Sequence, residues 1–202
     1  MVKGSSYWTA LSAVSGFTLI ELMVVVLIGA ILLGIAVPAL QSFIAANQLT
    51  AVTDTLASAL SEARSEAAKL NANVQLTPTN GGSDWTGGWT MAVPGAAGNG
   101  MPTTLRKAAA IPTGFTLKSS ASLTSTNPVT FDPMGRLVDP TGQQVGGGPL
   151  EFVICKGSGP AAGGASKMVI VATSGGVRVA QSDASGNPID AVGASYSGCS
   201  PP

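Results

Sequence analysis

Histidine is missing from this chain, and charged side chains are scarce. None of the 202 residues is a histidine, and Asp, Glu, Lys and Arg together make up 10% of them, against about 25% in typical soluble domains. Without imidazole the chain lacks the commonest general base and the commonest metal ligand. We therefore do not expect an enzyme, and we assign no catalytic residue, no metal site and no cofactor.

The charge balance and the few cysteines narrow the classes further. Lys and Arg total 10, as do Asp and Glu, so the chain lacks the basic excess typical of nucleic-acid-binding proteins. The two cysteines, Cys155 and Cys199, are far apart, and neither belongs to a Cys-x-x-Cys pair of the kind used in zinc or thioredoxin chemistry. They form either a structural disulfide or two free thiols.

A long apolar stretch near the N terminus has one acidic residue at its start. Residues 22–40 carry no charge, and as a helix they would span roughly 28 Å, close to the hydrocarbon thickness of a bilayer. Glu21 stands directly before this stretch, where an ionised carboxylate is costly and calls for a partner or a function. Pro38 has no backbone N–H, so it predicts a kink or break in the helix near residues 34–38.

The residues around this glutamate resemble a known processing signal. Gly-Phe-Thr-Leu-Ile-Glu at residues 16–21 is similar to the signal of type IV pilins and type II secretion pseudopilins. In that family a prepilin peptidase cuts after the glycine, here Gly16, and methylates the new amino terminus, here Phe17. The family's glutamate neutralises the amino terminus of an adjoining subunit, which would make Glu21 the assembly residue. The chain departs from the family at Ser15, where a basic residue is usual.

A second apolar pattern continues the helix beyond the membrane segment. Between residues 49 and 70, apolar side chains recur at spacings of three and four, which is typical of an amphipathic helix. We expect a prepilin leader at 1–16, a membrane and filament-core half of the helix at 17–47, and an amphipathic half at 48–73. The apolar stripe should pack on a sheet of the same chain; a coiled coil is the weaker alternative, because the stripe is alanine-rich and short.

A β domain is expected over residues 74–202, where short apolar runs alternate with clusters of Gly, Pro, Asn and Ser. We expect strands at residues 74–77, 88–93, 104–109, 115–118, 129–131, 150–155, 167–172 and 177–181. Loops are expected at 95–102, 139–149 and 157–166, and the last twenty residues show no regular pattern. The expected fold class is α+β, with a long N-terminal membrane-spanning helix, as in pilins, packed on a C-terminal antiparallel β-sheet domain.

Several short phrases of the β domain and helix resemble the FimT, FimU and GspH group of minor pilins and pseudopilins. They are residues 56–67, Trp85 with Gly88-Trp89, residues 131–136, and Cys155 with the late Cys199. The resemblance implies a helix packed against two β-sheets and a minor pilin-like subunit for type IV pilus assembly, at or near the tip. An H-type minor pseudopilin of a type II secretion system is the alternative.

The same resemblance implies partners and a location. The partners would be a prepilin peptidase, other minor and major pilins or pseudopilins, and inner-membrane lipid. The chain would cross the bacterial inner membrane once, with a periplasmic C-terminal domain, before entering a pilus or pseudopilus. In that oxidising compartment a disulfide between Cys155 and Cys199 is favoured over free thiols.

A DNA receptor of natural transformation is the third alternative. Some FimT-like minor pilins carry a Gly-Arg-x-Arg element, but residues 175–178 read Gly-Gly-Val-Arg and retain only Arg178. Between residues 151 and 202, three cations are balanced by three acids: Lys156, Lys167 and Arg178 against Glu151, Asp183 and Asp190. Because phosphate neutralisation requires a cluster of cations, DNA is a poor candidate partner.

Other conspicuous side chains are expected to be structural. Glu62, Arg64, Glu66 and Lys69 should form a solvated helix face, and Arg136 should be exposed. Trp85 and Trp89, which flank a glycine turn, should belong to the sheet core and its cap rather than to a ligand site.

Overall fold

The fold was analysed in a computed structural model, which describes residues 16–97, 101–120, 128–139, 141–157 and 165–199. The chain divides into two compact units, residues 1–43 and 44–202. This division falls shortly before the boundary expected between residues 47 and 48. Residues 1–15 of the expected leader lie outside the described residues.

Helix α1 (Leu19–Leu70) begins in the first unit and ends in the second. It runs through Pro38 without interruption, so local melting of the helix near residues 34–38 is not found. Proline at this position removes the hydrogen bond that its N–H would donate to the Gly34 carbonyl, and its ring crowds that carbonyl, yet the helix continues on both sides. A kink at Pro38 stays a prediction. At its C-terminal end Asn71 adopts a left-handed conformation (φ 48°) and the Ala72 N–H donates to the Ala67 carbonyl, a Schellman-type stop.

The N-terminal unit exposes its apolar side chains. Large apolar residues from Phe17 to Phe43 are exposed along the helix. Among the described residues, α1 has the length and apolar composition that crossing a membrane requires.

The first sheet has five antiparallel strands in the order β3-β2-β1-β5-β6. Its strands are β1 (Val74–Pro78), β2 (Trp89–Ala97), β3 (Met101–Lys107), β5 (Val129–Phe131) and β6 (Leu137–Val138). Along β1, buried and partly buried residues alternate, as expected for a strand with one face on a core.

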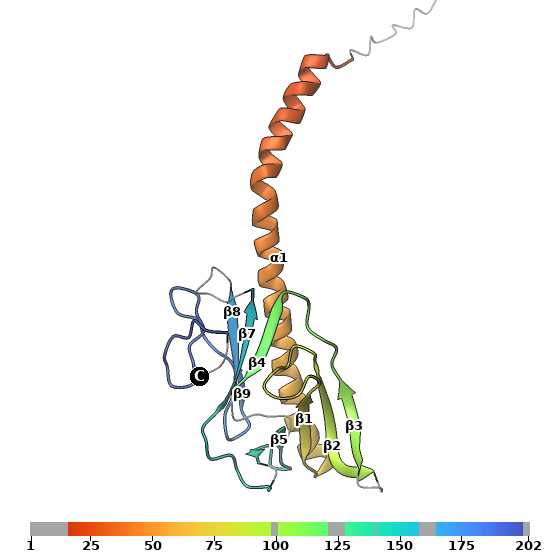
Figure 1. The fold of residues 1–202 in the computed structure, drawn as a ribbon, viewed down its shortest axis with the longest axis vertical. Helices are drawn as coiled ribbons and strands as arrows, with labels where there is room; N and C mark the ends of the chain where they lie inside the picture. The colour runs from red at the N-terminus through yellow and green to blue at the C-terminus, as the bar shows by residue number, and fades with distance from the viewer. Residues whose placement is uncertain (1–15, 98–100, 121–127, 140, 158–164, 200–202) are drawn as a thin grey trace, which may run out of the picture. The chain divides into compact units, whose positions relative to one another are not determined.

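The second sheet has four antiparallel strands in the order β4-β7-β8-β9. They are β4 (Phe115–Ser119), β7 (Leu150–Lys156), β8 (Ser166–Val171) and β9 (Val177–Val179). Figure 1 shows these four strands side by side, next to the separate group formed by β1, β2 and β3. The expected antiparallel β domain with two sheets is thus present.

Most of the expected strands are found, with two corrections. The loop expected at 95–102 is wrong, because β2 extends to Ala97 and β3 begins at Met101. Strand β6 was not expected, since two residues between turns give no alternation that a sequence pattern could reveal. Of the other expected loops, residues 140 and 158–164 lie outside the described residues.

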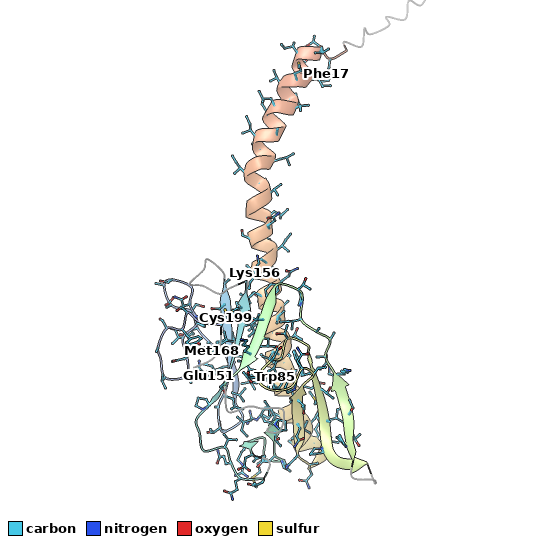
Figure 2. The ribbon with its side chains drawn as sticks, viewed as in Figure 1. Phe17, Trp85, Glu151, Lys156, Met168 and Cys199 are labelled. Carbon is cyan, nitrogen blue, oxygen red and sulfur yellow. A yellow bond between two sulfur atoms is a disulfide. The ribbon has the colours of Figure 1, made fainter. Side chains whose placement is uncertain are left out.

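The main core lies between the second half of α1 and both sheets. The buried helix stripe, Leu49, Val52, Leu56 and Leu60 among it, belongs to the same apolar cluster as residues of β1, β2, β4, β7 and β8. Trp85, labelled in Figure 2, is completely buried. Its ring meets that of Phe152 edge-on, with the ring centroids 5.1 Å apart. The helix therefore packs on sheets of its own chain, and Trp85 and Trp89 are core residues, as expected.

The opposite face of the second sheet is covered by the end of the chain. Residues 180–199, called the C-terminal flap below, place Ala180, Ala191, Tyr196 and Cys199 against a second apolar cluster formed by Val153, Cys155, Met168 and Ile170. Figure 2 shows Cys199, Met168 and Glu151 following one another along this sheet. Because β7 is covered on both faces, all but its last residue are buried.

Candidate functional site

The segment that precedes α1 contains the residues expected to be processed. Residues 16–18 are not helical, and the helix begins at Leu19. The Thr18 Oγ1 accepts a hydrogen bond from the Glu21 backbone N–H at 3.3 Å, and the Thr18 carbonyl accepts one from Leu22 at 3.2 Å. Thr18 is therefore the N-cap of the helix, and Glu21 occupies its first turn, where the helix dipole favours a negative charge.

Gly16 and Phe17 are accessible next to this cap. The Phe17 side chain is 79% exposed. A Cβ atom added to Gly16 would have nothing within 4 Å, and the glycine does not adopt a positive φ. Neither backbone conformation nor packing in the described structure therefore requires a glycine at this position.

A disulfide and a buried glutamate are among the contacts that attach the C-terminal flap to the second sheet. Cys155 and Cys199 form a disulfide with their Cα atoms 5.8 Å apart, which confirms the expected pairing. The Oε1 of Glu151, a residue only 7% exposed, accepts a hydrogen bond from the Ala191 backbone N–H at 2.7 Å. The flap is thus a third layer on the sheet.

Four turns of the sequence Asp-x-x-Gly share one hydrogen-bond pattern, and two of them shape the flap. In each turn the aspartate Oδ1 accepts the N–H groups two and four residues later, and the glycine, at positive φ, donates to the aspartate carbonyl. The turns begin at Asp132, Asp139, Asp183 and Asp190. The repetition is visible in the sequence and predicts turns, although the last twenty residues were expected to lack a regular pattern.

The charged side chains of α1 make contacts both along the helix and across the fold. Glu66 pairs with Lys69 at 2.7 Å, as the i,i+3 spacing predicts, whereas Glu62 pairs with Arg106 of β3, which the spacing does not predict. The Arg64 Nε donates to the Gly135 carbonyl at 3.0 Å. The expected solvated face is therefore also a junction between the helix and the first sheet.

Arg136 also has a role that its exposure does not reveal. Its Nε and Nη2 donate to the Asp132 Oδ2 at 2.9 and 2.6 Å. Burial acts to raise the pKa of Asp132, but the backbone hydrogen bond and the charge of Arg136 outweigh it and hold the pKa below its ordinary value. This fork-like pair closes the turn between β5 and β6.

A groove of about 720 Å³ runs between α1 and the segment that follows β3. Alanines contribute much of its apolar lining, at Ala51 and Ala59 of the helix and at Ala108 to Ala110, and polar side chains such as Gln48 and Arg106 line the rest. The Thr55 hydroxyl in its wall donates to the Ala51 carbonyl of its own helix at 2.7 Å. Among the described residues no group of three His, Cys, Asp or Glu is placed to hold a metal ion.

Arg178, the residue proposed for DNA contact, is exposed on β9 and lies opposite Ile170 of β8. Its closest cationic neighbours in sequence, Lys156 and Lys167, are on β7 and β8. A DNA contact at Arg178 stays a prediction.

The architecture defined by these observations is that of a pilin-like subunit: a long apolar N-terminal helix, whose second half packs on two antiparallel sheets. The sequence matches the family described as type II transport protein GspH over residues 52–175 and the prokaryotic N-terminal methylation motif over residues 11–37. The chain therefore belongs to the GspH family.

Two solved structures are similar to this fold, and both are of the type IV minor pilin FimU from Pseudomonas aeruginosa. The crystal form in space group P21 matches with a TM-score of 0.54 at 21% identity, covering 69% of this chain and 92% of FimU. The form in space group P65 matches with a TM-score of 0.51 at 21% identity, covering 66% and 93%. Among curated proteins none matches the sequence significantly.

Proposed function

We propose that this chain is a minor subunit of a type IV pilus, incorporated at or near the tip. It is made as a precursor, cut by a prepilin peptidase after Gly16 and methylated at the new amine of Phe17. The observation that carries the proposal is the methylation motif, matched over residues 11–37, whose cleavage point lies two residues before the helix N-cap at Thr18.

The structure around Gly16 supports recognition by another protein. A glycine that folding does not require is explained if a peptidase must bring its active site against the backbone there. Phe17 is exposed and outside the helix, so the bond between Gly16 and Phe17 precedes the helix in an accessible segment.

We propose that Glu21 sets the stagger between neighbouring helices during assembly. In a filament it would meet the methylated Phe17 amine of a neighbouring subunit. A desolvated pair gains little net energy, because removing both charges from water offsets their attraction, but an unpaired carboxylate in the same place is strongly disfavoured. The pair would therefore select one stagger between adjacent helices whose exposed apolar side chains become buried on assembly.

The location and partners follow from this proposal. Residues 17–47 would cross the inner membrane and later form the filament core, with residues 48–73 and the β domain at 74–202 in the periplasm. The leader, 1–16, would be removed. The partners are the prepilin peptidase, membrane lipid and other minor and major pilins.

The proposal is tested in the producing bacterium by shearing filaments from cells and detecting this chain beside the major pilin. A Glu21→Gln variant removes the registry charge and should accumulate in the membrane but be depleted from filaments by tenfold or more. Glu66→Gln, which removes a partly buried carboxylate of the same helix that pairs with Lys69, is the matched control and should be incorporated normally. Equal incorporation of both variants would contradict the role of Glu21.

An H-type pseudopilin of a type II secretion system is the second candidate, and the description of the GspH family favours it. Deleting the gene for this chain distinguishes the two candidates. Loss of surface pili with intact protein secretion supports a pilus subunit, and loss of secretion with intact pili supports a pseudopilus subunit. A DNA receptor would require retarded DNA migration with the purified chain that Arg178→Ala abolishes.

A further inference from the structure

The second sheet places two hydroxyl side chains directly beside Cys155. In the register of the sheet, Thr116 of β4 and Ser166 of β8 are the partners of Cys155 on either side. Directly paired residues of antiparallel strands project from the same face, with Cβ atoms about 4.5–5.5 Å apart. Thr116, Cys155 and Ser166 therefore form a row across three strands.

Both hydroxyls in this row are buried without a hydrogen-bond partner. The Thr116 Oγ1 and Ser166 Oγ atoms are inaccessible, and neither bonds to any group in the described part of the chain. Ser166 as a residue is 3% exposed. Leaving a buried hydroxyl without a hydrogen bond is unfavourable, so two such groups beside one cysteine require an explanation that the oxidised structure does not provide.

A thiolate at Cys155 would offer both hydroxyls an acceptor within the row. Cys155 packs with Val153, Met168 and Ile170, and apolar surroundings disfavour the charged form of a thiol. Hydrogen bonds from hydroxyl groups stabilise a thiolate and act against that effect. The charged or titratable groups on the same face are Lys118, Glu151 and Arg178 of the sheet and Asp190 and Tyr196 of the flap, and in strand register each sheet residue lies two or more positions along from Cys155.

We propose that Thr116 and Ser166 donate hydrogen bonds to the Cys155 thiolate during oxidative closure of the C-terminal flap, which makes Cys155 the nucleophile that completes the disulfide. The oxidant is a disulfide-bearing thiol compound or protein. The Cys199 thiolate first attacks one oxidant sulfur, forming a mixed disulfide and releasing one oxidant thiolate. The Cys155 thiolate then attacks the Cys199 Sγ, the bond from that sulfur to the oxidant breaks, and the second oxidant thiolate leaves.

Overall, two thiols become one disulfide, the oxidant disulfide becomes a dithiol, and the two protons lost by the cysteines are taken up by the oxidant sulfurs. A lower thiol pKa raises the thiolate fraction at Cys155, and the same hydroxyls make Cys155 a better leaving group when the bond is reduced. The row therefore speeds exchange in both directions without touching the apolar contacts that hold the flap.

The test uses the full chain in detergent micelles with Cys199→Ser, which leaves Cys155 as its thiol. The ultraviolet absorbance of the thiolate is followed against pH, with the Cys155→Ala, Cys199→Ser double variant subtracted. Ser166→Ala and Thr116→Val should each raise the pKa of Cys155 by about one unit, a tenfold loss of thiolate below the pKa. Ser166→Thr and Thr116→Ser keep the hydroxyl and should leave the pKa of Cys155 unchanged. Thr104→Val, on exposed β3, is the control and should also leave that pKa unchanged.

Closure is measured separately in the chain that retains both cysteines, after reduction and addition of oxidised glutathione. Loss of either hydroxyl should slow conversion of the mixed disulfide to the closed flap several-fold at neutral pH. Ser166→Ala removes one buried oxygen that has no partner, so this variant is expected to fold and its result is decisive. An unchanged pKa of Cys155 in Ser166→Ala and Thr116→Val would overturn the proposal, as would an equal shift in Thr104→Val.

Discussion

The Arg64 Nε donates a hydrogen bond to the carbonyl oxygen of Gly135 at 3.0 Å, across 71 positions of sequence. The guanidinium also approaches the Ser174 carbonyl, with Nη2 at 3.5 Å. One side chain of helix α1 thus reaches the turn that joins β5 to β6 in the first sheet and the turn that joins β8 to β9 in the second. The Arg64 side chain therefore links the helix to a turn of each sheet.

Replacing Arg64 with alanine should therefore destabilise the β domain. A hydrogen bond from a charged group contributes about 1.5–3 kcal/mol when protected, and because Arg64 is exposed we expect a loss of about 1 kcal/mol in urea unfolding. Lys69→Ala removes an exposed pair on the same helix and should change the stability by less than about 0.5 kcal/mol. Equal effects of the two variants would show that the Arg64 contact adds nothing beyond a surface charge.

Gly175 should be far less tolerant of substitution than another glycine with the same backbone conformation. Gly175 and Gly186 both have φ of 81°, so alanine costs roughly 1–2 kcal/mol at either position through conformation alone. A Cβ at Gly175 would also lie 1.7 Å from the Gly135 carbonyl oxygen, whereas at Gly186 it would meet nothing within 4 Å. Gly175→Ala should lose more than about 3 kcal/mol; thermal unfolding at equal midpoints for both variants would contradict the tight junction.

The stability of the domain should fall in acid partly through Asp132. The pKa of this carboxyl is held below its ordinary value because Arg136 outweighs the effect of burial. A lowered folded-state pKa contributes stability above the unfolded value, about 3.9, and this contribution disappears as the pH falls through the folded value. In urea unfolding, the loss of folding stability between pH 7 and pH 3 should be smaller for Asp132→Asn than for the wild type. Part of the loss should persist in the variant, because the pKa values of Asp84, Asp139 and Asp183 are also lowered. Parallel pH profiles would contradict the assignment.

The disulfide should account for a large part of the stability of the C-terminal flap. Cys155 and Cys199 are separated by 44 residues, and closing a loop of that length stabilises the folded state by about 4 kcal/mol in the chain-entropy model. Reductant should therefore lower the urea midpoint of the wild type. The double variant Cys155→Ala, Cys199→Ala should have the same urea midpoint with and without reductant. If reductant left the wild-type midpoint unchanged, the disulfide would not be what stabilises the flap.

The sequence predicts those parts of the fold in which periodicity is long or alternating. The helix to Leu70 and strands such as β1 have apolar patterns that a single packed face imposes. The junction at Arg64 could not be predicted, because its partners are backbone carbonyls brought near by the fold. The same holds for Glu151, whose sequence position in an apolar strand gives no hint that the flap returns to it.

Two local features of the structure are encoded in the sequence by short motifs. Thr18-x-x-Glu21 has the spacing of a helix capping box, and the structure places Thr18 at the N-cap. The repeated Asp-x-x-Gly turns predict the local folding of the flap at Asp183 and Asp190. The break expected at Pro38 was predicted from residue type alone, and the surrounding helix overrides it.

Pilin-type processing is tested most directly by mass spectrometry of this chain recovered from sheared filaments or from the membrane. Cleavage after Gly16 followed by methylation predicts a mature protein that begins at Phe17 and carries one methyl group on its terminal nitrogen. Filament material that retains Met1 and the leader, or that begins at a residue other than Phe17, would contradict processing after Gly16 and with it the proposed pilin-type assembly.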